Sequence, residues 1–386
     1  MSDVASKLKV SELDFDAIKS NLKNFLGDQN ELADYNFDGS AMSVLMDLLA
    51  YNTHYNAFYL NMIVNEMFLD TASLRNSVVS RAKHLGYPPT SVRGAKAYVD
   101  LTITPANTPT NIVVEKDTQF SATVNGISYI FSTSDSATVN INSNGIYTTA
   151  NVELKQGVQL THRYTANVSD PDQRFSLPNA NTDTSSLVVQ IQTSATSSNL
   201  HTYSVANDTT SINSTANVYF LEEDTDSKYR VYFGDGTVGR ALTTGNIIVL
   251  KSLIADAGAP NGAKTFTPTG TVGGYSNVTV TTTSTASGGA DRDSISSIKF
   301  NAPRNYQAQN RAVTINDYIR IVQRDCTDAE SVIAWGGEDN DPPVYGKVYL
   351  AIKPASGLQL STTTKNSIKN DILAKRNVVS ISTEIQ

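Results

Sequence analysis

The sequence predicts an α+β multidomain protein with an N-terminal helical bundle, a central all-β domain and a C-terminal ferredoxin-like α/β unit. Residues 1–90 carry apolar side chains at helical spacing. Residues 91–290 are rich in Thr, Ser, Asn and Val with short alternating runs, and residues 291–386 return to mixed helix and strand patterns. A length of 386 residues suits two or three domains with substantial cores, and these three ranges are the predicted domains.

The longest helical pattern runs from Ser40 to Leu69 and contains no glycine or proline. Ser40, directly after Gly39, is a typical N-cap residue. Apolar residues then recur at alternating steps of three and four, which keeps one stripe facing a partner helix. The first stripe consists of Ala41, Val44, Leu48, Tyr51, Tyr55, Phe58 and Met62, and a second stripe beside it consists of Leu45, Leu49, Tyr59, Ile63 and Met67.

Together the two stripes form an apolar face that is too wide for one neighbouring helix, so contact with at least two other helices is expected. Two interpretations stay open: the helix is the core of its own domain, or other chains bury it. The aromatic residues do not decide between them, because Tyr is common in cores and in interfaces. His54 is interpreted as a packing or interface residue. The candidate interface residues are Val44, Leu45, Leu48, Leu49, Tyr51, Tyr55, Phe58, Tyr59, Met62 and Ile63.

Two shorter helices are predicted beside the long one. The first contains Phe15, Ile18, Leu22 and Phe25 at helical spacing and ends at Gly27. The second is expected to be capped by Thr71 and stopped by Gly86, with Leu74, Val78, Ala82 and Leu85 on its buried side. A bundle of three such helices would be only marginally stable alone, which favours stabilisation by a partner protein.

Short period-two runs bounded by Asn, Gly and Pro predict strands in the central region. They include residues 99–103, 112–114, 129–131, 187–192, 218–220, 229–233 and 247–250. No fixed internal period is present, which argues against a β-helix or a propeller. The polar stretch Thr193–Asn217 is expected to hold a long exposed loop.

The last third predicts alternating helices and strands. Asp293 is expected to cap a helix through Phe300, and Thr314 with Asp317 forms a capping-box-like start of the next helix. Strands 331–335 and 347–352, a helix 363–374 and a strand 378–385 follow. This order resembles a split βαβ unit. Because the chain stops at the last strand, we expect the unit to be cut short or completed by something else.

One segment has the spacing of a nucleotide-binding loop. Gly234-Asp235-Gly236-Thr237-Val238-Gly239 matches G-x-G-x-x-G, and Asp256 stands where a ribose-binding acid could lie. The dinucleotide fingerprint needs a helix after the glycines, whereas another strand is predicted here. A hairpin turn that binds no ligand is therefore the favoured interpretation.

No other spacing points to chemistry or to a cofactor. The histidines lack metal-ligand spacing, and Cys326 is the only cysteine. The acidic group Glu222, Glu223, Asp224 and Asp226 lacks the calcium-loop pattern and is interpreted as a solvated loop. Glycosidase carboxylate pairs leave no spacing signature, so a glycan-cleaving enzyme stays an alternative.

Charge and hydropathy exclude two further classes. The formal net charge is -7 and charged residues make up 17%, which argues against a nucleic-acid-binding surface. The N-terminus lacks the apolar run of a signal peptide, and no stretch is long enough to span a bilayer. We therefore expect a cytosolic or particle-borne protein without membrane insertion.

Several blocks of the sequence resemble a known family. The stretch Asn30–Pro89, with LMDLLAYNTHYNAFYLN and TASLRNSVVSRAKHLGYPPTS, closely resembles the baseplate wedge proteins of T-even-type contractile-tailed phages. Later blocks resemble the wider baseplate J-like family: FGDGTVGR (233–240), GGADRDSISSIKFNAPRNYQAQNRAVTINDY (288–318) and KPASG (353–357). The resemblance runs with gaps from about Asn21 to the last predicted helix and is weakest in the middle β region.

The resemblance implies a structural subunit with no catalytic residues and no cofactor. In that family two copies pair asymmetrically with one larger wedge protein through a shared helical bundle, and the ring of wedges around the tail hub widens on contraction. The implied partners are a second copy of this chain, the larger wedge protein, and other baseplate, hub and sheath-initiating proteins. The implied location is the virion tail baseplate, after assembly in the host cytoplasm. The family's wedge protein continues well past residue 386, so contacts between neighbouring wedges are not carried over.

Two expectations complete the prediction. Glycines at Gly86–Gly94 and Ser287–Gly289 are expected to let the three bodies rotate during contraction. A receptor-binding tail fibre protein is a further alternative, but such a protein would more naturally show trimeric repeats, and none is present.

Overall fold

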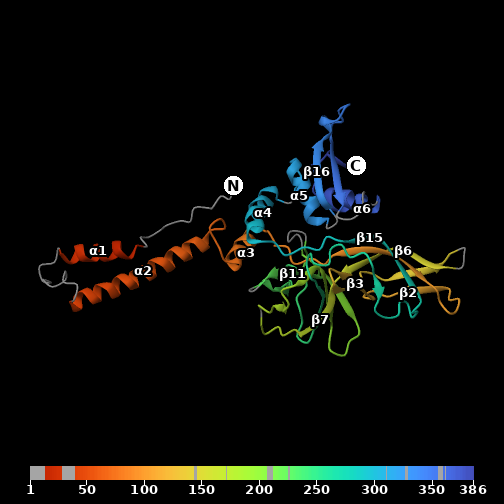
Figure 1. The fold of residues 1–386 in the computed structure, drawn as a ribbon, viewed down its shortest axis with the longest axis horizontal. Coiled ribbons are helices and arrows are strands. Elements are labelled where there is room, and N and C mark those ends of the chain that lie inside the picture. Colours follow the sequence, from red (N-terminus) through yellow and green to blue (C-terminus); the bar gives the residue numbers. More distant parts are fainter. Residues whose placement is uncertain are drawn as a thin grey trace. The chain divides into compact units, whose positions relative to one another are not determined.

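The computed structural model describes residues 14–27, 40–142, 146–170, 172–206, 212–224, 227–309, 311–326, 329–354, 360 and 362–386. It divides into two compact units, one drawn from Met1–Tyr87 and Ser294–Pro303 and the other from Pro88–Asp293 and Arg304–Gln386. N-terminal helices, a β-rich centre and a C-terminal α/β unit confirm the predicted fold class (Figure 1). The three predicted domain ranges stay a prediction.

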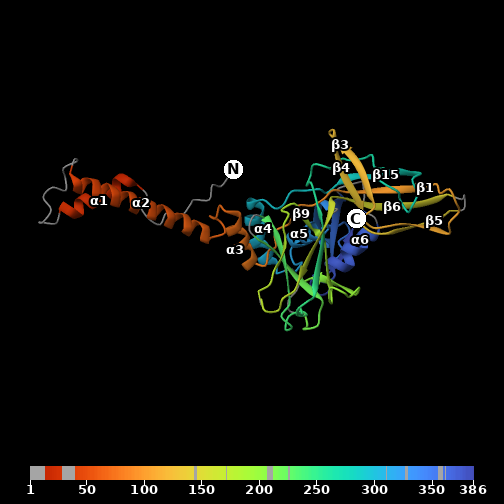
Figure 2. The same cartoon turned by 90° about the horizontal axis from the view of Figure 1, so that it is seen from below.

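The first unit begins with two helices that lie side by side (Figures 1 and 2). Helix α1 spans Phe15–Gly27 and helix α2 spans Ala41–Met67, as predicted. Ser40 caps α2, because its Oγ accepts a hydrogen bond from the Ser43 amide at 3.1 Å. Between the helices, Lys19 Nζ lies 2.5 Å from Asp47 Oδ1.

The third helix begins later than predicted. Helix α3 spans Arg75–His84, and the Thr71 hydroxyl donates to the Asn65 carbonyl (2.6 Å) instead of capping the helix. The Glu66 carboxylate, from the end of α2, accepts the amides of Ser73 (2.8 Å) and Leu74. Leu74 is 52% exposed, so the prediction that it is buried is wrong. A carboxylate from the preceding helix has taken the capping role.

The core around α3 includes a helix from a distant part of the sequence. Helix α4 spans Ile295–Ala308, and its first part packs against α3. The Lys299 ammonium donates to the Asp70 carbonyl at 2.8 Å. The shared buried residues are Ala72, Val78, Val79, Ala82, Tyr87, Ile298 and Ala302. The predicted helices are therefore present, and α3 shares its core with α4.

Two β-sheets build the central region of the second unit (Figures 1 and 2). In the first, the order is β14 (Thr267–Pro268), β3 (Gln119–Val124), β4 (Ile127–Thr133), β6 (Tyr147–Gln156), β1 (Lys96–Ile103) and β15 (Val278–Ser287), with β2 (Asn111–Val114) and β5 (Ala137–Ile141) attached beside β6. In the second, it is β7 (Val158–Thr165), β13 (Ile247–Ile254), β9 (Thr182–Gln192), β10 (Leu200–Val205), β11 (Val218–Glu223), β12 (Tyr229–Phe233) and β8 (Phe175–Leu177).

All seven predicted strand segments lie in strands of these sheets, and each sheet has its own core. Alternate residues of β1 are buried, as period-two patterning requires. The stretch Thr193–Asn217, predicted to hold a long exposed loop, contains strand β10, and residues 207–211 lie outside the described residues.

A buried ion pair joins the two sheets. Asp183, on β9, is fully buried, and its Oδ2 lies 2.9 Å from Lys155 Nζ on β6. The same oxygen accepts the Gly94 amide at 3.0 Å, and Oδ1 accepts the Ser185 amide at 2.9 Å. A buried carboxylate is tolerated only when its oxygens are satisfied in this way.

The chain runs into and out of the β-rich region through one paired segment, here called the strap: residues 90–93 paired with 290–293. Arg93 and Ala290 exchange two backbone hydrogen bonds (2.9 and 3.1 Å). The Thr90 amide donates to Asp293 Oδ2 at 2.9 Å, and the Asp293 amide donates to the Thr90 carbonyl at 3.1 Å. Asp293 therefore does not cap α4; Ser294 does, accepting the Ser297 amide at 3.1 Å.

The two glycines beside the strap serve close packing. A Cβ at Gly94 would lie 2.2 Å from the Gln156 carbonyl oxygen, and one at Gly289 would lie 2.3 Å from the Ala257 carbonyl oxygen. Only glycine lets the backbones approach this closely. These contacts argue against Gly94 and Gly289 as points of rotation.

The C-terminal region follows the predicted order of elements. Helix α5 (Ile315–Asp325) starts with the predicted capping box of Thr314 and Asp317. Strands β16 (Ala329–Gly336) and β17 (Lys347–Pro354) are antiparallel, and β18 (Ser382–Ile385) pairs parallel with β17. Helix α6 (Thr362–Ser367) continues as a π-helical segment, Ile368–Leu373. The predicted strand 378–385 is shorter than expected, and residues 355–357 of KPASG lie outside the described residues.

Replacing Asp183 by Asn should lower the free energy of unfolding by about 3–5 kcal/mol, because Lys155 is left as an unpaired buried charge. Urea denaturation followed by the β-sheet circular dichroism signal measures the change. Asp135→Asn, at an exposed position, is the matched control and should shift stability by less than about 0.5 kcal/mol. Equal effects of the two substitutions would show that the ion pair does not hold the sheets together.

Candidate partner-binding surface

The ten predicted interface residues of α2 are exposed in this chain. We call them the α2 surface: Val44, Leu45, Leu48, Leu49, Tyr51, Tyr55, Phe58, Tyr59, Met62 and Ile63. Their exposed fractions run from 40% for Tyr55 to 64% for Val44. These side chains are therefore not part of a core among the described residues, and their burial by other chains stays a prediction.

A different stripe of α2 is packed within the chain. The buried residues of the helix are Ser43, Met46, Ala50, Ala57 and Asn61. They also recur at helical spacing, but they are mostly small, which lets a neighbouring backbone approach closely. The helical spacing of apolar residues thus predicted the helix correctly. It did not predict that the side packed within the chain would be the one with mostly small residues.

Aromatic side chains form a ladder along the α2 surface. The ring centroids of Tyr51 and Tyr55 are 4.6 Å apart, those of Tyr55 and Tyr59 are 6.3 Å apart, and those of Phe58 and Tyr59 are 5.9 Å apart. His54 meets Tyr55 edge-on at 5.8 Å, which fits a packing role. Hydrogen bonding with Tyr55 raises the pKa of the Tyr51 hydroxyl, so it stays neutral at physiological pH. The ladder gives a partner a rigid aromatic surface.

The apolar area extends past the predicted residues. Leu60, Met67 and Phe68 are 47%, 54% and 52% exposed. Leu60 belongs to neither predicted stripe, although the unbroken apolar run of the helix could have indicated it. Between Ser43 and Asn65, Asp47 is the only residue with a formal charge, and Lys19 neutralises it. The surface is therefore both apolar and uncharged over most of the helix.

The glycine-rich segment after β12 is a closed turn but not the hairpin predicted. Strands β12 and β13 are not paired with each other: β12 pairs with β11 and β8, and β13 with β7 and β9. Asp235 Oδ1 accepts the amides of Thr237 (2.8 Å) and Val238 (3.1 Å), which lowers the pKa of the Asp235 carboxyl. Asp256 is held elsewhere, by the Gln156 amide at 2.7 Å. A strand and not a helix follows the glycines, as predicted.

The acidic group at 222–224 is neutralised by arginines. Arg174 and Arg230 both contact Glu222, and Arg230 also lies 3.1 Å from Asp224. These contacts replace the solvated loop that was expected, and Asp226 lies outside the described residues.

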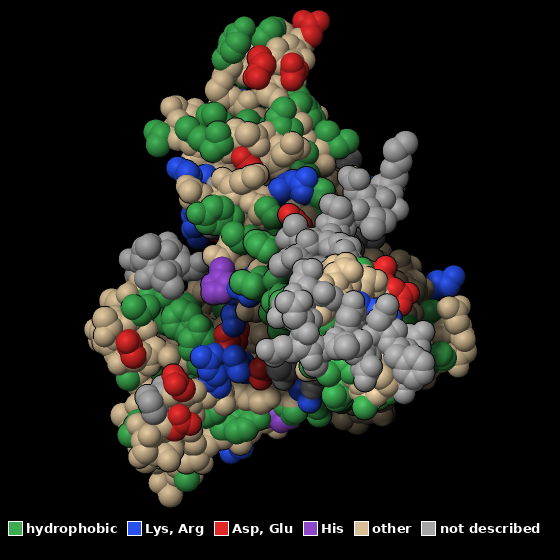
Figure 3. All heavy atoms as spheres, turned by 90° about the vertical axis from the view of Figure 1, so that its left-hand side faces the viewer, with side chains coloured by type: hydrophobic (Ala, Val, Ile, Leu, Met, Phe, Trp, Pro, Cys, Tyr) green, Lys and Arg blue, Asp and Glu red, His purple; other side chains and the backbone are tan. Residues whose placement is uncertain are grey.

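Other kinds of site find little support in the part of the chain that the structure describes. Its His, Cys, Asp and Glu side chains form no group of three that could hold a metal ion. None of its helices is both long and apolar enough to cross a membrane. On the face shown in Figure 3, the described basic and acidic side chains are interspersed and form no extended area of one charge.

The buried side of α2 and the exposed α2 surface should respond differently to substitution when the chain is studied without partners. Met46→Asp places a carboxylate at a position that is 1% exposed and should cost several kcal/mol, about the penalty for burying an unpaired charge. Leu48→Asp, at a position 62% exposed, should change stability by less than about 0.5 kcal/mol. Hydrogen exchange of the α2 amides at low protein concentration measures both. Faster exchange in both variants would mean that α2 packs differently.

Comparison with known proteins supports the resemblance seen in the sequence. The helical domain of the family described as "Baseplate wedge protein gp6-like" matches residues 14–87, and "Baseplate structural protein gp6, C-terminal domain I" matches residues 314–386. Baseplate wedge protein gp6 of Enterobacteria phage T4 is 29% identical over 92% of this chain. The match covers 56% of that protein, so this chain spans about half the length of its relative.

A chain in the cryo-EM structure of the anti-feeding prophage (AFP) baseplate is also similar. It is 12% identical, and the match covers 98% of this chain and 80% of that one, with a TM-score of 0.32. A TM-score this low does not establish a common fold. The two domain matches and the relative from phage T4 show that the chain is similar to gp6-like baseplate wedge proteins at both of its ends and along most of its length.

Proposed function

We propose that this chain is a structural, non-enzymatic subunit of the baseplate wedge of a contractile phage tail, carried in the virion and assembled in the host cytoplasm. The similarity to gp6-like baseplate wedge proteins supports this role. The single observation that carries the mechanism is the α2 surface, an apolar and uncharged face that the chain leaves exposed. No observation favours the glycan-cleaving enzyme or the tail fibre protein over this role.

Exposure on this scale is a strong physical reason to expect a partner. Burying one large aliphatic or aromatic side chain stabilises by about 1.5–3 kcal/mol. Contiguous exposed apolar patches above a few hundred Å² are rare on monomeric proteins and usually mark interaction sites. Helix α2 has 27 residues whereas α1 has 13, so α1 cannot cover its whole length.

The proposed partners follow from the width of the surface. Its two stripes need at least two helices, which fits a bundle shared by a second copy of this chain and a larger wedge protein. Other baseplate, hub and sheath-initiating proteins would meet the chain elsewhere. Nucleic acid and membranes are not among the proposed partners.

Leu48→Asp or Phe58→Asp should abolish wedge assembly while the β-rich region stays folded. A carboxylate inside such a bundle costs several kcal/mol, which weakens association about a hundredfold or more. Light scattering coupled to gel filtration of the chain mixed with purified wedge proteins measures assembly, and circular dichroism checks folding. Val379→Asp, at an apolar position that is 90% exposed and outside α2, is the matched control and should assemble normally. Normal assembly of Leu48→Asp would refute the shared bundle.

We further propose that the two compact units move as nearly rigid bodies when the tail contracts. The chain passes between the units at Tyr87–Pro88, at Asp293–Ser294 and, inside α4, at Pro303–Arg304. The strap and the tight packing at Gly94 and Gly289 favour rotation at these points over the glycines expected from sequence. Structures of the tail before and after contraction test this. Each unit should superpose closely on itself while the angle between the units changes. An unchanged angle, or a changed strap, would contradict the proposal.

A further inference from the structure

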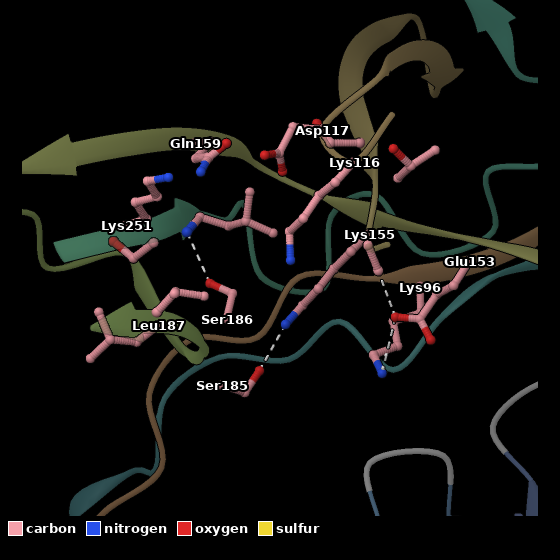
Figure 4. Close-up of a pocket in the computed structure, with 16 residues that line it drawn as sticks. Lys96, Lys116, Asp117, Glu153, Lys155, Gln159, Ser185, Ser186, Leu187 and Lys251 are labelled. Carbon is pink, nitrogen blue, oxygen red and sulfur yellow. Dashed lines mark hydrogen bonds and ion pairs between the residues drawn. The ribbon is translucent and has the colours of Figure 1, made fainter. Parts of the chain in front are cut away.

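A cavity between the two central sheets has the composition of an anion-binding site (Figure 4). It measures about 370 Å³, within the size range of small-molecule sites. Strands β1, β4 and β6 line it from the first sheet, and β7, β9 and β13 line it from the second. Four lysines face two carboxylates in its lining: Lys96, Lys116, Lys155 and Lys251 against Asp117 and Glu153.

Two of these lysines are already neutralised within the chain. Lys96 Nζ lies 3.4 Å from Glu153 Oε1, and Lys155 is paired with the buried Asp183. Burial alone would raise the pKa of Glu153, but Lys96 and hydrogen bonds from Ser134 and Tyr98 outweigh it and lower that pKa. Glu153 therefore stays charged and keeps Lys96 occupied at neutral pH.

The other two lysines have no carboxylate within ion-pair distance among the described residues. Lys116 comes from the turn between β2 and β3, and Lys251 comes from β13. Figure 4 shows Lys116 and Lys155 extending their ammonium groups into the same space. Asp117 is held from the side by Gln159, whose amide nitrogen can lie 2.7 Å from Asp117 Oδ2. The lining thus retains an excess of positive charge.

A second observation points to a ligand. Ser252 also lines the cavity and is 2% exposed, yet its hydroxyl has no hydrogen-bond partner among the described residues. A buried hydroxyl without a partner costs free energy, so such groups are rare unless something else satisfies them. The neighbouring Ser186 hydroxyl, in contrast, is satisfied by the Asp183 carbonyl (2.7 Å) and the Leu253 amide (2.9 Å).

We propose that this cavity binds a small molecule carrying a phosphate or sulfate group, with Lys116 and Lys251 neutralising the oxyanion and Ser252 donating a hydrogen bond to it. A dianion matches two unpaired ammonium groups better than a carboxylate does. The cavity is larger than one phosphate ion, so the natural ligand carries the group on a larger body. This site is separate from the α2 surface and does not depend on the proposed role in assembly.

Calorimetric titration of the full chain with inorganic phosphate, at constant ionic strength in chloride, tests the proposal. Saturable binding is expected, with sulfate competing and acetate binding much more weakly. Lys116→Gln and Lys251→Gln should each weaken phosphate binding about tenfold or more, since each removes a charge-assisted contact. Lys264→Gln, which changes the net charge equally at an exposed position outside the cavity, should leave the affinity unchanged.

Ser252→Ala separates a ligand site from a merely hydrated cavity. If the proposal holds, this variant binds phosphate more weakly, while its unfolding midpoint without phosphate is unchanged or higher because an unsatisfied buried hydroxyl is gone. Absence of phosphate binding by the unaltered chain would overturn the proposal. So would equal loss of affinity in Lys116→Gln and Lys264→Gln, which would indicate a general charge effect, or undiminished affinity in Ser252→Ala.

Discussion

The apolar surface of α2 exceeds what the described part of this chain can cover, and the organisation of the helical unit follows from that shortage. Within the described residues α2 buries only a narrow stripe of mostly small side chains, and Lys19 of α1 pairs with Asp47 of α2. The larger side chains on the rest of the helix stay in contact with water, where each carries an unfavourable hydration free energy. The proposed bundle with further helices would remove these side chains from water.

Unlike helix α2, the β-rich region buries most of its large apolar side chains within the chain itself. Each sheet has its own apolar core, and the buried charges of Asp183 and Lys155 between the sheets are paired with each other. Asp183 receives an ammonium group and two backbone amides, so its charge can be buried at tolerable cost. Ser252, within the same region, departs from that rule, which is why the cavity beside it is informative.

Most local signals in the sequence were reliable predictors, although the caps predicted at Thr71 and Asp293 were wrong. Signals that depend on distant residues were less reliable. The caps at Ser40 and Thr314 and the strand segments depend on neighbours along the chain, and the structure confirms them. The start of α3 depends on Glu66, and the pairing of β12 depends on strands far away in sequence. Helical spacing alone could not distinguish the packed stripe of α2 from the exposed ones, since all share the same period.

The strap has a consequence for how the gene can change. Residues 90–93 are hydrogen-bonded to residues 290–293, so the segment between them begins and ends at the same place in the structure. A segment of this kind is a cassette: it can lengthen, shrink or be exchanged for another fold while the paired ends keep their geometry.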